Sequence, residues 1–103
     1  MKKLKLFEQK WLETLDEHIE NNLENPQFNI QQLALKMHLS SASFYRKVVK
    51  LLGISPSDYL RQKRLDRAKD LFDSKKNYSL QELAEKVGYK RKDHFAKIFE
   101  DSL

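Results

Sequence analysis

We expect an all-α fold for this chain, because three features of its 103 residues favour helices. It contains only two glycines and two prolines, too few for a turn-rich β-sandwich or barrel. Its apolar residues recur at helical spacing, and one helical pattern returns after 50 residues. Hydrophobic residues make up 40% of the chain, which is enough for a modest core. A single domain over residues 1–103 is therefore expected.

An N-terminal helix is predicted over residues 6–23. Its apolar stripe advances in steps of four residues through Phe7, Trp11, Leu15, Ile19 and Leu23. The Asn25-Pro26 pair ends this helix, because the residue before a proline avoids the helical region.

Two short helices separated by a tight turn are predicted over residues 29–53. Asn29 is a good N-cap for the first helix, and Gln32 can complete a capping box. Ser40 caps the second helix, and Gly53 closes it where a left-handed residue is wanted. This pattern is typical of a helix-turn-helix.

A central helix is predicted over residues 55–73. Ser55 serves as its cap and Pro56 occupies its first position, where the missing N–H costs nothing. An internal repeat follows this helix.

Residues 78–89 match residues 28–39 with a constant offset of 50. Ala34 coincides with Ala84, as expected where two helices cross closely and only a small side chain fits. The match predicts a second helix-turn-helix over residues 79–103.

The turn regions of the two copies also correspond. Ser79 and Glu82 form a second capping box, and Gly88 suits a turn position with positive φ. His38 takes the equivalent place in the first copy, where it is tolerable. Beyond this turn the offset becomes 51, so one residue has been inserted.

The composition excludes several kinds of chemistry. The chain has no cysteine, so disulfides, cysteine-ligated metals and thiol catalysis are excluded. Its histidines are scattered, and it has no glycine-rich phosphate loop or serine nucleophile motif. No apolar run approaches the length needed to span a membrane. We expect a cytoplasmic protein that is not an enzyme and that needs no metal or cofactor.

The charge is unevenly distributed along the chain. Lysine and arginine number 20 against 15 acidic residues, a net charge of +5. Residues 8–24 hold six acidic residues and one lysine, whereas residues 28–103 hold 16 basic and nine acidic residues. This asymmetry indicates a face that attracts polyanions; a well-solvated surface is the alternative.

Two segments carry a resemblance to a known family. They are LSSASFYRKVVKLLGISPSDYLRQKRLDRAKDLF and LAEKVGYKRKDHFAKIF. The first resembles the serine-capped recognition helix, the Gly-x-Ser-Pro-x-x-Tyr connection and the Arg-Leu-x-x-Ala central helix of the AraC/XylS family of bacterial transcription regulators. The second resembles that family's Ala-x-x-x-Gly-Phe and Tyr-Phe-x-x-x-Phe patterns. The resemblance extends from about Trp11 to Phe99.

This resemblance implies the DNA-binding domain of a regulator: two helix-turn-helix units joined by a central helix. It further implies sequence-specific binding to double-stranded DNA, with two recognition helices reading successive major grooves. The chain departs from the family in three places. Lys90 stands where a serine usually caps the second recognition helix, His94 replaces a tyrosine, and the chain stops at Leu103, before the family's Gly-x-x-Pro-x-x-Tyr-Arg ending.

The resemblance also assigns residues to DNA contacts. The expected base-reading residues are Ala42, Tyr45 and Arg46 in the first unit and Lys92, Asp93, Ala96 and Lys97 in the second. Arg46 is the best candidate among them, because its planar fork can pair with guanine O6 and N7. The expected phosphate contacts are Ser41, Ser43, Lys50, Arg64, Lys90 and Arg91, and a structural role is the alternative for Arg64.

The family's regulators usually carry a sensing or dimerising part. We therefore expect this chain to be the C-terminal output part of a larger protein, monomeric when isolated, with RNA polymerase as a further partner in the full regulator. A helical module that binds proteins and uses the helix-turn-helix units only as a scaffold is the alternative function. Basic outward positions on both recognition helices argue against that alternative.

Overall fold

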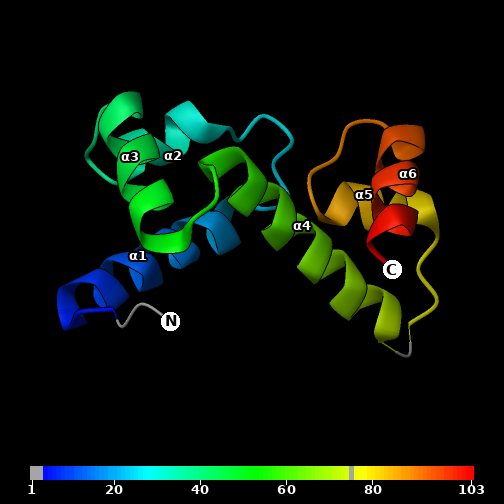
Figure 1. The fold of residues 1–103 in the computed structure, drawn as a ribbon. Coiled ribbons are helices and arrows are strands. Elements are labelled where there is room, and N and C mark those ends of the chain that lie inside the picture. The colour runs from blue at the N-terminus through cyan, green and yellow to red at the C-terminus, as the bar shows by residue number, and fades with distance from the viewer. Residues whose placement is uncertain (1–3, 75) are drawn as a thin grey trace. The chain divides into compact units, whose positions relative to one another are not determined.

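The computed structural model describes residues 4–74 and 76–103, and the regular structure of those residues is entirely α-helical (Figure 1). The helices in chain order are α1 (Leu6–Asn22), α2 (Ile30–Lys36), α3 (Ser41–Leu52), α4 (Pro56–Asp73), α5 (Leu80–Lys86) and α6 (Lys92–Ser102). The predicted all-α class is confirmed, and the helices predicted at the N-terminus and in the centre agree closely with α1 and α4.

The chain divides into two compact units. The first unit contains Phe28–Leu60 and the chain up to Asn22; the second contains Leu23–Gln27 and Arg61–Leu103. Helix α4 therefore begins in the first unit and continues in the second. The loop that follows α1 belongs to the second unit rather than to the first.

The predicted helix caps are present in both units. The Asn29 side-chain oxygen accepts from the Gln32 N–H at 2.9 Å, and Gln32 Oε1 accepts from the Asn29 N–H at 3.1 Å. Ser79 and Glu82 make the same reciprocal pair at 3.1 Å each. These bonds from Ser79 hold the pKa of Glu82 below its usual value. The caps satisfy N–H groups that a helix start leaves without partners.

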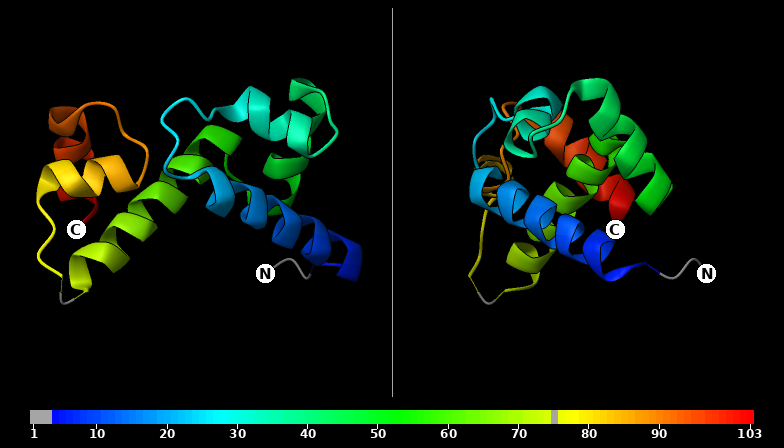
Figure 2. Two further views of the ribbon diagram at one scale, coloured as in Figure 1. Left: turned by 180° about the vertical axis from the view of Figure 1, so that it is seen from behind. Right: turned by 90° about the vertical axis from the view of Figure 1, so that its left-hand side faces the viewer.

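The first unit is built on α1, α2 and α3. Helix α2 contacts both α1 and α3. Figure 2 shows α1 in blue, α2 in cyan and α3 in green. The buried side chains of the first unit include Leu15 and Ile19 from α1, Leu33 and Ala34 from α2, and Phe44 and Val48 from α3. The start of α4 is tied to α1 because the Tyr59 hydroxyl donates to Asp16 Oδ1 at 2.5 Å. Burial and this carboxylate raise the pKa of Tyr59, so the phenol stays protonated.

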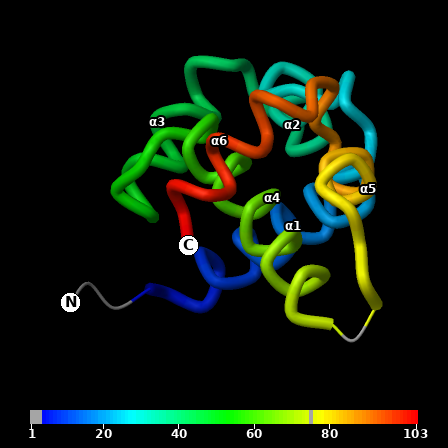
Figure 3. The backbone as a smooth tube through the Cα atoms, turned by 90° about the vertical axis from the view of Figure 1, so that its right-hand side faces the viewer, coloured from blue at the N-terminus to red at the C-terminus, as the bar shows by residue number. Residues whose placement is uncertain are grey.

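The second unit packs α5 and α6 against the later part of α4. Figure 3 shows α5 leading through its turn into α6. The core cluster consists of Leu65, Ala68, Leu83, Ala84, Val87, Phe95 and Phe99. The Phe95 and Phe99 rings stack with their centroids 5.2 Å apart. As predicted, Ala34 and Ala84 are both buried, each with 1% of its surface exposed.

The repeat extends further than the sequence indicates. Helix α4 begins 50 residues after α1, and α5 begins 50 residues after α2. Each helix-turn-helix therefore follows a long helix at the same spacing. The sequence indicates α4 only as a connection between the two helix-turn-helix units, because its apolar pattern does not reproduce that of α1 residue by residue.

The two turns have the same backbone design. His38 has a φ of 60° and Gly88 a φ of 79°, as the repeat predicts. The N–H of Leu39 donates to the carbonyl oxygen of Ala34 at 3.0 Å, and that of Tyr89 donates to the carbonyl oxygen of Ala84 at 2.9 Å.

The expected cap of the last helix is corrected by the structure. Helix α6 begins at Lys92, so its N-cap is Arg91 and not Lys90. The extra residue after the second turn accounts for the shift, because Arg91 lies 51 residues after Ser40, the N-cap of α3. Ser40 Oγ accepts from the Ser43 N–H at 3.2 Å, whereas the Arg91 side chain makes no capping bond.

Replacing Arg91 with serine is expected to raise the free energy of unfolding by about 0.5–2 kcal/mol, because a hydroxyl can accept a bond from the start of α6. Thermal or urea unfolding measures the change. Lys90→Ser is the matched control and should leave stability within about 0.5 kcal/mol of the parent. A larger gain from Lys90→Ser than from Arg91→Ser would contradict this assignment of the cap.

Candidate nucleic-acid interface

The exposed side of α3 carries the residues predicted to read bases in the first unit. Ala42, Tyr45 and Arg46 are all exposed, and Phe44 between them is buried in the core. Arg46 Nη2 donates to Ser43 Oγ at 3.3 Å, so the serine orients the guanidinium one helical turn away. The expected orientation of α3 is thus present, with its apolar face inward and its polar face outward.

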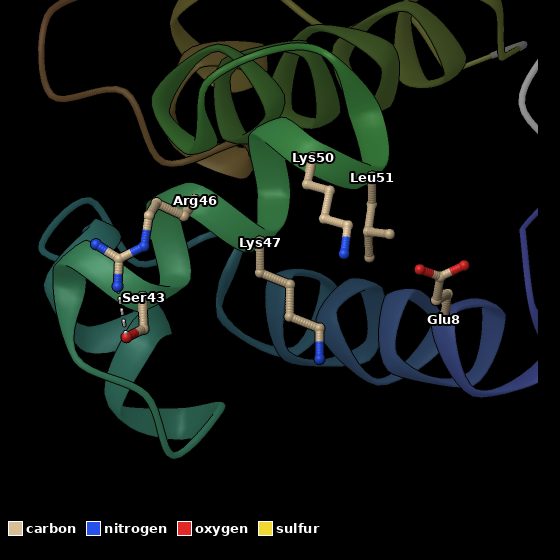
Figure 4. Close-up of a pocket in the computed structure, with 6 residues that line it drawn as sticks. All are labelled: Glu8, Ser43, Arg46, Lys47, Lys50 and Leu51. Atoms are coloured by element: carbon tan, nitrogen blue, oxygen red, sulfur yellow. Dashed lines mark hydrogen bonds between the residues drawn. The ribbon is translucent and has the colours of Figure 1, made fainter.

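A pocket of about 390 Å³ lies beside this face, between α3 and the start of α1. It is lined by Glu8, Ser43, Arg46, Lys47, Lys50 and Leu51. Figure 4 shows Lys47 and Lys50 extending from α3 toward α1, which carries Glu8, while Arg46 extends toward Ser43. Three cationic side chains from one helix face outnumber the single carboxylate of Glu8, which makes this pocket suitable for an anion such as a phosphate group.

Lys47 was not among the residues singled out in the sequence. Its Nζ lies 4.7 Å from the centroid of the Trp11 ring in α1, within the range of a cation–π interaction. Spacing alone offered a signal, since Ser43, Arg46, Lys47 and Lys50 fall on one face of a helix. Trp11 lies on the apolar stripe of α1, so the sequence pattern indicates a core residue and gives no sign of its contact with Lys47.

The start of α6 presents the corresponding residues of the second unit. Lys90, Arg91, Lys92, Asp93 and Lys97 are exposed, and Ala96 is half-buried. Ser41 and Lys50 of the first unit are exposed as well, and Ser43 is half-buried.

Asp93 is held by its neighbour. Arg91 Nη2 donates to Asp93 Oδ2 at 2.9 Å, with both side chains largely exposed. The hydrogen bond from Arg91, together with a backbone bond from His94, holds the pKa of Asp93 below its usual value. An ionised carboxylate here is able to accept a bond from a cytosine amino group.

Arg64, for which a phosphate contact was expected with a structural role as the alternative, is buried in the structure. Only 6% of this residue is exposed, and its guanidinium donates to main-chain carbonyl groups inside the second unit. A guanidinium that is buried and bonded in this way does not reach a phosphate at the surface. Burial lowers the pKa of Arg64, although an arginine stays protonated in proteins.

Two further features of the described residues bear on function. Within residues 4–74 and 76–103, histidine, aspartate and glutamate side chains form no group of three or more that could hold a metal ion. The helices in those same ranges are all too short or too polar to cross a membrane.

Comparison with protein families gives a match over most of the chain. A family model described as "Helix-turn-helix domain" matches residues 33–102. A probable transcriptional regulator, LumQ of Photobacterium leiognathi, is 30% identical over 101 residues, which cover 93% of this chain and 40% of the relative. The chain spans between 6% and 40% of the length of the curated relatives that it matches.

Solved structures agree with this match. The C-terminal domain of the two-component response regulator yesN from Fusobacterium nucleatum is 31% identical, with a TM-score of 0.82, and the alignment covers 90% of this chain and 97% of that one. The DNA-binding domain of the global transcriptional factor AdpA, in complex with a target DNA, is 26% identical, with a TM-score of 0.78 and coverage of 90% and 81%.

Proposed function

Because the chain belongs to the AraC-type helix-turn-helix family of DNA-binding domains, we propose that α3 and α6 are its recognition helices and read the sequence of duplex DNA in bacterial transcription regulation. The observation that carries this proposal is the occurrence of two helix-turn-helix units whose second helices both expose basic side chains. A helix of this kind fits the major groove, where its N-terminal half meets the base edges.

The proposed base contacts come from Ala42, Tyr45, Arg46, Lys92, Asp93, Ala96 and Lys97. The proposed phosphate contacts come from Ser41, Ser43, Lys50, Lys90 and Arg91, and the pocket adds Lys47. Arg64 is no longer included, because it is buried. Among the base contacts, Arg46 has the strongest support, since Ser43 already holds its guanidinium at the exposed face.

We also propose that the domain binds DNA as a monomer, acts on RNA polymerase within a longer protein and is located in the cytoplasm. One chain supplies two reading helices, which supports binding as a monomer. Relatives with names of transcription regulators support an action on RNA polymerase within a longer protein. Bacterial DNA lies in the cytoplasm, which supports that location for the domain.

DNA affinity is expected to fall steeply with salt, because bound cationic side chains release counterions from phosphates. For about four phosphate contacts, the loss is roughly 100-fold between 50 and 200 mM salt. Titration of a fluorescent duplex at several salt concentrations measures the slope. Affinity that stays constant over this range would contradict the proposal and favour a protein-binding module.

Arg46→Ala is expected to cost about 1–3 kcal/mol at the preferred site and to relax preference at one base pair, because a bidentate contact to guanine is lost. Lys50→Ala is the matched control on the same helix. It should weaken binding evenly across sequences and reduce the salt slope by about one. An even loss across all sequences for Arg46→Ala would reassign this residue to a phosphate.

Two reading helices also predict a dependence on spacing. Inserting about five base pairs between the two DNA elements turns one of them to the opposite side of the duplex and should remove most of the specific affinity. The same insertion outside both elements is the control and should have little effect. If the inserted site binds as well as the parent site, only one of the two units reads DNA.

A further inference from the structure

The buried Arg64 joins three segments of the second unit. Its Nη1 donates to the carbonyl oxygens of Val87 at 2.6 Å and of Leu23 at 2.9 Å, and its Nη2 donates to that of Asn25 at 3.4 Å. Helix α4 is thereby connected to the loop after α1 and to the turn of the second helix-turn-helix. A guanidinium suits this role because it is planar and offers several donors in fixed directions.

The turn itself is shaped to receive this side chain. A Cβ atom added to Gly88 would lie 1.7 Å from Arg64 Nη1 and 2.3 Å from the carbonyl oxygen of Leu23. Backbone conformation alone does not require glycine here, because His38 adopts a positive φ at the equivalent position of the first unit. The close approach of Arg64 therefore explains why the second copy has glycine and the first does not.

The same turn determines where α6 begins. Val87 is fully buried, and its carbonyl is the one that Arg64 holds most closely. Two residues later, the Tyr89 N–H donates to Ala84 in α5, and the Tyr89 ring lies 5.3 Å from the ring of Phe95 in α6. A displacement of the Val87 carbonyl would thus be passed through Tyr89 to α6.

We propose that Arg64 is a positioning residue for α6, so that the base preference of the second unit depends on a side chain that is itself buried. The inference rests on the proposed DNA-binding function. It differs from the sequence-based expectation, in which Arg64 contacts a phosphate directly. A direct phosphate contact would affect all DNA sequences equally, whereas a positioning role affects preference at the second element alone.

The test uses Arg64→Lys in the full chain, because lysine keeps the charge but replaces the planar fork with a single ammonium group. Arg67→Lys makes the same chemical change at an exposed position of α4 and is the matched control. The probe is a duplex selected from random DNA by the parent protein. Single base-pair variants of each of its two elements supply the competitors.

The readout is the ratio of affinities for the selected duplex and each variant. Partial unfolding lowers both affinities by the same factor, so the ratio reports only on folded molecules. For Arg64→Lys, the ratio at the second element should fall roughly fivefold or more, toward one, because misplaced contacts lose discrimination of about 1–3 kcal/mol per base pair. The ratio at the first element should stay unchanged, and Arg67→Lys should match the parent at both.

Three results would overturn the proposal. For Arg64→Lys, the ratio at the second element could stay at the parent value, or the ratios at both elements could fall equally. Alternatively, the amide NMR spectrum of this variant could lack the native signals of the second unit. The last result would assign Arg64 to folding rather than to positioning. Failure of the parent protein to prefer any sequence is a different result, because it would contradict the proposed function itself.

Discussion

Both helix-turn-helix units depend on the close packing of two short helices over one alanine. Ala34 and Ala84 are buried in the helix pairs, and the carbonyl of each also accepts the hydrogen bond that closes the following turn. A larger side chain would therefore disturb two features at once. It would separate the paired helices, and it would move the acceptor on which the turn depends. Because protein interiors are densely packed, such a separation would also leave space around Phe44 or Phe95, each fully buried in its own unit.

The role of each arginine depends on whether its side chain is buried or exposed. Arg64 is surrounded by main-chain carbonyl oxygens that compensate for its lost hydration, so its charge acts within the fold. Arg46 and Arg91 are exposed, and they bond to a neighbouring serine and a neighbouring aspartate, respectively. Such contacts are weak enough to be exchanged for contacts with nucleic acid. The first kind of contact organises the scaffold, and the second prepares side chains for a partner.

Local signals in the sequence were sufficient for most of the architecture. Caps at Asn29, Ser40 and Ser79 act within one turn of chain, so residue spacing alone identifies them. The cap of α6 was misplaced because one inserted residue shifts the register after Gly88, and no capping side chain marks the true position. The burial of Arg64 depends on carbonyls far away in the sequence, and a basic residue on an amphipathic helix gives no sign of them. Distant contacts of this kind become visible only in three dimensions.

The two compact units are interleaved along the chain. Leu23–Gln27 lies between segments of the first unit but belongs to the second, and Pro56–Leu60 at the start of α4 belongs to the first. During synthesis from the N-terminus, the carbonyls of Leu23 and Asn25 emerge long before Arg64, the donor that they share. These carbonyls must remain hydrated until the first half of α4 has been made. The second unit therefore cannot be obtained by cutting the chain at the start of α4, because a piece of it would stay behind with α1.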